Sequence, residues 1–177
     1  MKKTILLLII MAIFNCCKND DDTPTNPIDQ LPQATQIGAN TAGCLVNGEA
    51  FLPNNGSVIP LVCNYLDGED FSLGISKEVN NVFSAVDIYL YNTSLQIGQT
   101  YQLNENIINS KYGEYSINTA TSPNPNFYTT TSAITGELTI THHDFDNAFL
   151  SGSFWFDAVN SNGEIIEVRE GRFDMEY

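Results

Sequence analysis

Between residues 42 and 177, apolar and polar residues alternate in short stretches, and turn signals rich in Gly, Asn and Asp separate these stretches. Residues 71–76 and 85–91 show this alternation. Strict alternation is typical of a strand that buries one face, whereas no stretch keeps the 3.6-residue period of an amphipathic helix. The pattern therefore predicts a single β domain over 42–177.

Two dipeptides in the first half of this region predict tight hairpins. Asn47-Gly48 and Asp67-Gly68 each lie between two apolar runs. Asn, Asp and Gly tolerate the positive φ that a type I′ turn requires. Further strands are expected at 100–103, 112–118, 127–131, 137–141, 150–159, 165–169 and from Gly171 to the end.

The C-terminal third has the clearest two-residue period. Residues 142–147, which begin His142-His143-Asp144, are expected to form a polar hairpin turn before the strand at 150–159. In the last strand the alternation predicts that Phe173, Met175 and Tyr177 point inward and that Arg172, Asp174 and Glu176 point outward.

About nine or ten short strands separated by turn signals predict an all-β fold, namely an antiparallel β-sandwich. A flattened β-barrel is the alternative, because periodicity does not separate the two architectures.

The N-terminus has the anatomy of a lipoprotein signal peptide (residues 1–15). Lys2 and Lys3 precede a short apolar run, Thr4 to Phe14, whereas a bilayer core needs about 20 apolar residues to be spanned. The run ends at Ile13-Phe14-Asn15-Cys16, which resembles the lipobox of bacterial lipoproteins except that Asn15 stands where Gly, Ala or Ser is preferred. Cys16 is the expected lipidation site, with Cys17 as the alternative.

Residues 16–41 are predicted to form a disordered, acidic and proline-containing tether. Its cluster Asp20-Asp21-Asp22 resembles the surface-export signal of Bacteroidota lipoproteins. We therefore expect export and attachment to the outer membrane through an acylated cysteine, with the domain facing the cell surface. The periplasmic face is the alternative.

Charge excludes two classes of partner. The 7 Lys and Arg stand against 21 Asp and Glu, which gives a formal charge of −14. Nucleic-acid binding requires basic neutralisation of phosphates, and electrostatic docking on anionic lipid requires a basic patch. No Gly-rich phosphate loop occurs, and no cofactor is expected.

The remaining chemistry-bearing residues give few candidates. Cys44 and Cys63 are a candidate disulfide because export leads to an oxidising compartment and both are expected in neighbouring strands; two free, buried thiols are the alternative. His142 and His143 would point to opposite faces of a strand, so no metal site is expected. The carboxylates at 67–70 are interpreted as a solvated turn.

Trp155 is expected on the face opposite Phe154 and Phe156. Together with Tyr89, Tyr91 or Tyr128 it is a candidate for stacking on a sugar or another flat ligand. No catalytic residue is assigned.

Three segments in the C-terminal third suggest a relationship to known proteins. Thr135–Ile140, Ser151–Val159 and Glu170–Asp174, together with Gly43–Gly48, resemble a family of small Bacteroidota lipoproteins whose shared domain has no known function. The resemblance implies secretion, lipidation and a β domain, and it brings no catalytic residues. We expect an anchored envelope lipoprotein whose β domain is non-catalytic and binds a glycan, a small ligand or a protein, or has a structural role. The alternative is a carboxylate-dependent hydrolase acting on glycans.

Overall fold

The computed structural model describes residues 26–57, 59–119 and 124–177. In these residues the secondary structure is nearly all β, with one short 3-10 helix, η1 (Pro27–Gln30), and no α-helix. The strands are β1 (Thr41–Val46), β2 (Glu49–Phe51), β3 (Leu61–Leu66), β4 (Asp70–Val79), β5 (Val82–Leu90), β6 (Thr100–Leu103), β7 (Lys111–Thr119), β8 (Asn126–Thr129), β9 (Gly136–Asp144), β10 (Phe149–Val159) and β11 (Ile165–Glu176).

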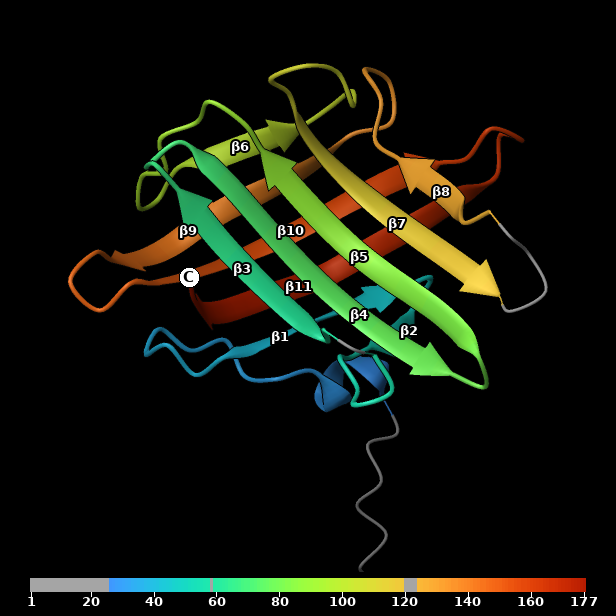
Figure 1. Ribbon diagram of the computed structural model, residues 1–177, viewed down its shortest axis with the longest axis horizontal. Coiled ribbons are helices and arrows are strands. Elements are labelled where there is room, and N and C mark those ends of the chain that lie inside the picture. The colour runs from blue at the N-terminus through green and yellow to red at the C-terminus, as the bar shows by residue number, and fades with distance from the viewer. Residues whose placement is uncertain (1–25, 58, 120–123) are drawn as a thin grey trace, which may run out of the picture.

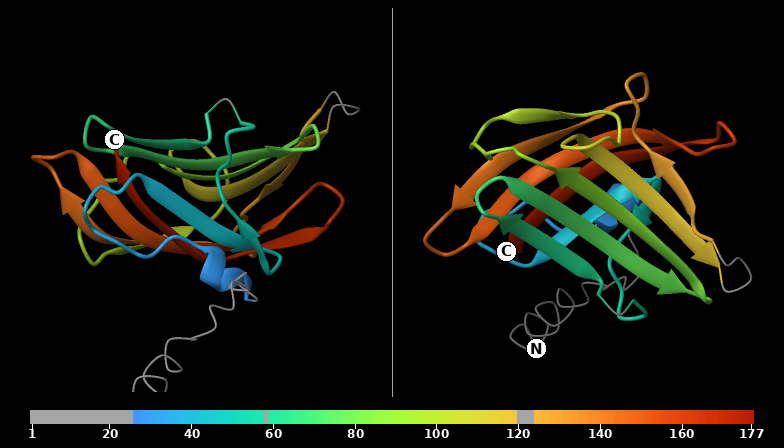
Figure 2. Two further views of the ribbon diagram at one scale, coloured as in Figure 1. Left: turned by 90° about the horizontal axis from the view of Figure 1, so that it is seen from below. Right: turned by 45° about the horizontal axis from the view of Figure 1, so that its top comes forward.

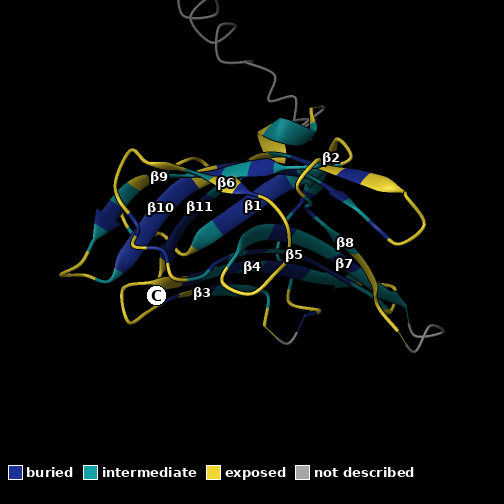
Figure 3. Cartoon of the chain, turned by 90° about the horizontal axis from the view of Figure 1, so that it is seen from above, coloured by how far each residue is buried: buried dark blue, intermediate teal, exposed yellow. Residues whose placement is uncertain are grey.

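The eleven strands form one antiparallel sheet that folds over into two layers (Figures 1 and 3). The hydrogen-bonded path runs β2-β1-β11-β10-β8-β7-β5-β4-β3, and β9 extends it from β10 to β6. β6, β9, β10, β11, β1 and β2 make the first layer, and β3, β4, β5 and β7 make the second (Figure 3). β8 joins the layers, because it pairs with β7 and meets β10 only at Val159 and Thr129. The sheet is not closed, and the prediction of an all-β antiparallel fold is confirmed.

Both predicted hairpin turns are confirmed. Asn47 and Gly48 have φ of 50° and 84°, and Asp67 and Gly68 have φ of 52° and 75°. These are the positive values that a type I′ turn requires at both central residues. The turn between β9 and β10 lies later than predicted. His142, His143 and Asp144 belong to β9, and the chain reverses after Asp144.

The side chain of Asp144 fixes where this reversal starts. Its Oδ1 accepts hydrogen bonds from the backbone N–H groups of Asp146 and Asn147, at 3.0 and 2.9 Å. An aspartate that binds the backbone two residues on is a common way to begin a turn.

The two strands predicted at 165–169 and from Gly171 are one continuous strand, β11. A β-bulge separates the two parts, because the register against β10 steps from Gly171 opposite Phe154 to Val168 opposite Phe156. Glu170 occupies the bulge with a φ of 54°. β11 is therefore longer than either predicted strand, whereas β10 agrees with the strand predicted at 150–159 to within one residue.

The core lies between the two layers and centres on Phe156, whose side chain is fully buried. Its ring fits because glycines face it from both layers. A Cβ on Gly113 of β7 would lie 2.7 Å from Phe156 Cδ1, and a Cβ on Gly136 of β9 would overlap Phe156 itself. Interiors pack at crystal-like density, so a side chain at either glycine would have no room beside Phe156.

The outer face of β11 is partly covered by the N-terminal strap, which we define as residues 31–40. Leu31 is buried. Asp174 of β11 lies beneath the strap with only 1% of its surface exposed. Asp174 does point outward as predicted, but the strap rather than solvent lies against it.

The Asp174 carboxylate holds the strap through several hydrogen bonds. Oδ2 accepts from Thr35 Oγ1 at 2.7 Å and from the N–H groups of Ile37 and Ala39, while Oδ1 accepts from the Gly38 N–H and from Ser151 Oγ. Residues 26–40 thus have defined contacts, and the packed domain begins before residue 42. The remainder of the predicted tether and the signal peptide lie outside the described residues. Within the described part of the chain, no helix is long and apolar enough to cross a membrane.

Candidate functional site

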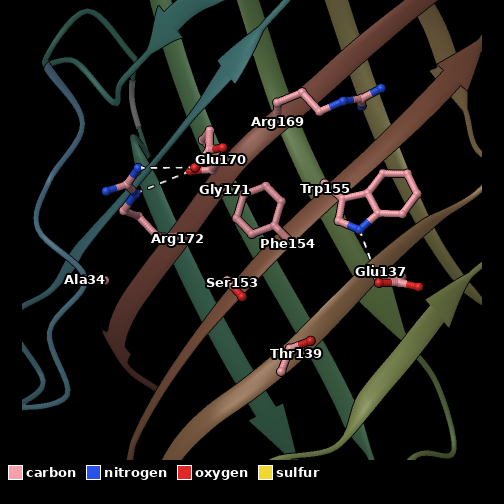
Figure 4. A pocket seen from close by; sticks show the side chains of 10 residues that line it. All are labelled: Ala34, Glu137, Thr139, Ser153, Phe154, Trp155, Arg169, Glu170, Gly171 and Arg172. Atoms are coloured by element: carbon pink, nitrogen blue, oxygen red, sulfur yellow. Dashed lines mark hydrogen bonds and ion pairs between the residues drawn. The ribbon is translucent and has the colours of Figure 1, made fainter. Parts of the chain in front are cut away.

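A groove of about 530 Å³ lies on the outer face of the first layer, across β9, β10 and β11 (Figure 4). Side chains alternate across a strand, and most of the lining residues lie on the face that points away from the core. Phe154, which is only 3% exposed, belongs to the core. Ala34 of the N-terminal strap adds one wall. The lining residues are Ala34, Glu137, Thr139, Ser153, Phe154, Trp155, Arg169, Glu170, Gly171 and Arg172.

Trp155 is the largest side chain in this groove, and 37% of its surface is exposed. Its indole Nε1 donates a hydrogen bond of 3.2 Å to Glu137 Oε2 on β9. Glu137 is held in turn, because its Oε1 accepts from Gln102 Nε2 of β6 at 2.8 Å. The indole is therefore fixed in orientation while remaining accessible.

Arg169 fixes the indole from a second side. Its guanidinium lies 5.5 Å from the centre of the Trp155 ring system. A cation this close to an aromatic ring makes a cation–π contact. The guanidinium also forms an ion pair of 2.6 Å with Asp157 Oδ1 and donates to the Phe156 carbonyl oxygen at 3.1 Å. It is thus held by the protein at one edge of the groove.

The opposite side of the groove is polar and mixed in charge. Arg172 Nη2 lies 3.9 Å from Glu170 Oε2, and Arg172 Nε donates to the Glu170 carbonyl oxygen (Figure 4). Ser153 and Thr139 also line the groove (Figure 4). An accessible aromatic ring beside fixed donors and acceptors suits a ligand that has both an apolar face and hydroxyl groups.

The structure does not bring Tyr89 and Tyr91 to Trp155. Tyr89 lies on the outer face of β5 and Tyr91 directly follows that strand, whereas Trp155 lies on the outer face of the other layer (Figures 1 and 3). Tyr128 packs against the core, with its ring centre 5.8 Å from that of Tyr115. The prediction that Trp155 forms one stacking site with any of these tyrosines is therefore wrong.

Cys44 and Cys63 are free and buried. They lie on β1 and β3, which are not neighbours in the sheet. The expectation that both cysteines lie in neighbouring strands, on which the candidate disulfide rested, is therefore wrong. Burial raises the pKa of both thiols to about 12, although Lys77 acts to lower that of Cys44. Both behave as small apolar core residues.

His142 and His143 point to opposite faces of β9, as predicted. His142 is half-buried and stacks on Phe149, whereas His143 is buried and bonds to Tyr177 Oη at 2.9 Å. Among the described residues, no group of three or more His, Cys, Asp or Glu side chains is placed to hold a metal ion.

Two carboxylates with raised pKa values lie outside the groove. Burial and the neighbouring Glu114 raise the pKa of Asp87 to about 7, and burial raises that of Glu114. They are cross-strand neighbours on the outer face of β5 and β7. Glycoside hydrolysis places two carboxyl groups on either side of the scissile bond, and neither of these residues lines one of the larger grooves described for this chain.

The sequence pointed to Trp155 but not to the residues that hold it. Glu137 and Arg169 come from two other strands, and only the register of β9 and β11 against β10 brings them to Trp155. Charge is the sequence feature that could have pointed to this groove. After residue 41 the chain has only four cations, namely Lys77, Lys111, Arg169 and Arg172. Two of these four line one groove.

The fold and site define an open two-layer antiparallel β protein with a groove on one outer face. The chain belongs to the family defined by a domain of unknown function, DUF6252, whose model matches residues 73–175. The match runs from β4 to β11 and includes the three C-terminal segments, but it does not reach Gly43–Gly48. Comparison with curated proteins and with solved structures gave no match.

Proposed function

We propose that this protein is a lipid-anchored envelope lipoprotein whose β domain is a non-catalytic carbohydrate-binding module. The observation that carries the binding role is the partly exposed indole of Trp155, held in an open groove by Glu137 and Arg169. Sugar rings present an apolar face to an aromatic ring and hydroxyl groups to its polar neighbours. Preorganisation of the indole lowers the entropy lost on binding.

The anchor is supported by the sequence. The basic head, the short apolar run and the lipobox-like segment ending at Cys16 are the features of a lipoprotein signal. One acyl chain holds a protein only marginally, so two or more chains on Cys16, or on Cys17 as the alternative, are needed for stable attachment. The proposed location is the outer membrane facing the cell surface, with its periplasmic face as the alternative.

The binding role is tested with the chain's own fluorescence, because Trp155 is its only tryptophan. The soluble chain from residue 26 is screened on an array of neutral and acidic oligosaccharides, and each hit is titrated while Trp155 emission is recorded. We expect a saturable change with at least one oligosaccharide. Trp155→Ala should weaken binding at least tenfold on the array, which corresponds to about 1.4 kcal/mol.

Phe127→Ala is the matched control, because Phe127 is an exposed aromatic residue of β8 outside the groove. It should leave the affinity unchanged. Absence of binding to every oligosaccharide, or equal affinity of the Trp155→Ala variant, would refute the binding role.

The anchor is tested independently by mass spectrometry of the mature N-terminus. We expect an acylated Cys16 at the first position and loss of the modification in Cys16→Ser. A mature chain with neither cysteine acylated would refute anchoring without affecting the binding role.

A further inference from the structure

The outer face of the second layer carries a row of stacked tyrosines. The ring centres of Tyr89 and Tyr112 are 5.0 Å apart, and those of Tyr89 and Tyr91 are 6.2 Å apart with an angle of 9° between the planes. β3, β4, β5 and β7 stand in the foreground of Figure 1, and no other described element covers them. Half-buried tyrosines on an uncovered face are typical of protein interfaces, where they contribute large contact area at low entropic cost.

Asp87 and Glu114 lie beside this row. They pair with each other across β5 and β7, two residues along these strands from the Tyr89–Tyr112 pair. The Asp87 side chain contacts Gly74 of β4. A Cβ atom on Gly74 would lie 2.8 Å from Asp87 Oδ1. A side chain at position 74 would displace the carboxylate, so the glycine provides the space that Asp87 occupies. No ion pair joins Asp87 to a described residue.

The cations of the described residues all lie elsewhere. The ammonium group of Lys77 lies 4.4 Å from the centre of the Phe51 ring, and Arg169 and Arg172 line the groove of the other layer. Lys111 lines a groove near Glu105. The negative charge beside the tyrosine row therefore has no counterion among the described residues.

We propose that this face is a docking surface for a partner protein that places a lysine or arginine side chain between the Asp87–Glu114 pair and the Tyr89–Tyr112 rings. The argument is charge complementarity: a cation is the group that both carboxylates and aromatic rings attract. A guanidinium or ammonium there supplies the missing counterion, while the tyrosine row contacts the apolar stem of the same side chain. The proposal does not depend on the Trp155 groove.

Docking on this face should depend on pH near neutrality. The titratable groups that face Asp87 are Glu114 and Tyr112 from β7 and Tyr89 from its own strand, while β4 presents Ser72 and Gly74. Burial, and next the charge of Glu114, raise the pKa of Asp87 to about 7, so it is largely protonated at pH 5.5 and ionised at pH 8. A cationic ligand should therefore bind more tightly at pH 8 than at pH 5.5.

The test uses a triarginine peptide and its tricitrulline analogue, which keeps the shape and removes the charge. The ¹⁵N- and ¹³C-labelled chain from residue 26 is titrated with each peptide, and chemical shifts of the Asp87 and Glu114 carboxyl groups are followed by NMR. We expect the triarginine peptide to shift both groups, with an affinity about fivefold higher at pH 8 than at pH 5.5. The tricitrulline peptide should bind at least fivefold more weakly.

Asp87→Asn and Glu114→Gln should each weaken triarginine binding severalfold, with backbone amide shifts at β5 and β7 as the readout in these variants. Glu49→Gln is the matched control, because it removes one exposed carboxylate from β2 and should leave the affinity unchanged. Three results would each overturn the proposal: equal binding of the tricitrulline peptide, an equal loss in Glu49→Gln, or shifts at Asp87 and Glu114 with calcium chloride alone and none with the peptide. Unfolding curves are recorded for all variants, so that weaker binding caused by a folding defect is distinguished from loss of the binding contact.

Discussion

At the scale of single residues, Asp174 illustrates how a buried carboxylate can be stabilising. Burial acts to raise its pKa, but the hydrogen bonds from Thr35, Ile37, Ser151 and Ala39 outweigh burial and lower the pKa to about 2. Hydrogen bonds to a charged group each contribute about 1.5–3 kcal/mol. The carboxylate therefore attaches the N-terminal strap to β11, although no described cation is paired with it.

We predict that Asp174→Asn lowers the free energy of unfolding by about 2–4 kcal/mol at pH 7, because an amide leaves some of the strap's N–H donors unpaired. The pKa of Asp174 is lower in the folded state, so its contribution is present above the ordinary aspartate pKa and is lost as the pH falls toward 2. Urea denaturation at pH 7 and at pH 2 measures both effects. The wild type should lose about 2 kcal/mol more than Asp174→Asn over this interval, and equal losses would contradict the assignment.

At the scale of elements, β11 depends on one unusual backbone position. Glu170 has a φ of 54°, and the resulting bulge lets the strand continue past Gly171. A left-handed conformation costs an L-residue with a side chain about 1–2 kcal/mol. The ion pair of Glu170 with Arg172, at 3.9 Å and with Glu170 half exposed, offsets little of this cost. Backbone strain is thus stored beside the Trp155 groove.

Replacement of Glu170 by glycine should relieve that strain. We predict that Glu170→Gly is at least as stable as the wild type, whereas Glu170→Val is less stable by about 1–2 kcal/mol because a β-branched residue disfavours positive φ. Glu167→Gly is the matched control at an ordinary extended position of β11, and it should lose about 0.5–1 kcal/mol. Thermal unfolding of the three variants checks the order, and a destabilised Glu170→Gly would contradict it.

β11 also shows where prediction from sequence succeeds and where it fails. Alternation correctly placed Phe173 and Met175 inside, because burial of one face is a local property of the strand. Alternation also correctly predicted that Asp174 lies on the outer face. It did not predict that Asp174 is buried there, because the burial depends on residues 35–39, which are distant along the chain. Glu137 and Arg169 likewise reach Trp155 only through strand register, which a single sequence does not specify.

At the scale of the whole molecule, two groups in different parts of the sandwich make stability depend on pH in opposite directions. His143 of β9 lies between the layers, with its ring centre 5.4 Å from that of Tyr65 on β3. Burial, and next the charge of His142, lower the pKa of His143. Since the unfolded chain then binds a proton more readily, His143 destabilises the fold as the pH falls below about 6.5.

Asp87 acts with the opposite sign. Its pKa is about 7 in the folded chain, well above that of an ordinary aspartate, so the folded state takes up a proton between pH 8 and 5.5 while the unfolded state does not. Acidification over this interval should therefore stabilise the fold through Asp87 by about 1–2 kcal/mol. The two contributions partly cancel, and the wild-type pH profile alone reports only their sum.

Two substitutions separate these contributions. We predict that His143→Gln, whose amide can still bond to Tyr177, removes the destabilising part, so that this variant becomes more stable as the pH falls from 8 to 5.5. Asp87→Asn removes the stabilising part, so that this variant becomes less stable over the same interval. Urea denaturation in steps of half a pH unit measures the wild type and both variants. If His143→Gln and Asp87→Asn shifted the profile in the same direction, the opposing titrations would be refuted. The half-buried, unpaired state of Asp87, on which docking of a cationic partner depends, would be refuted with them.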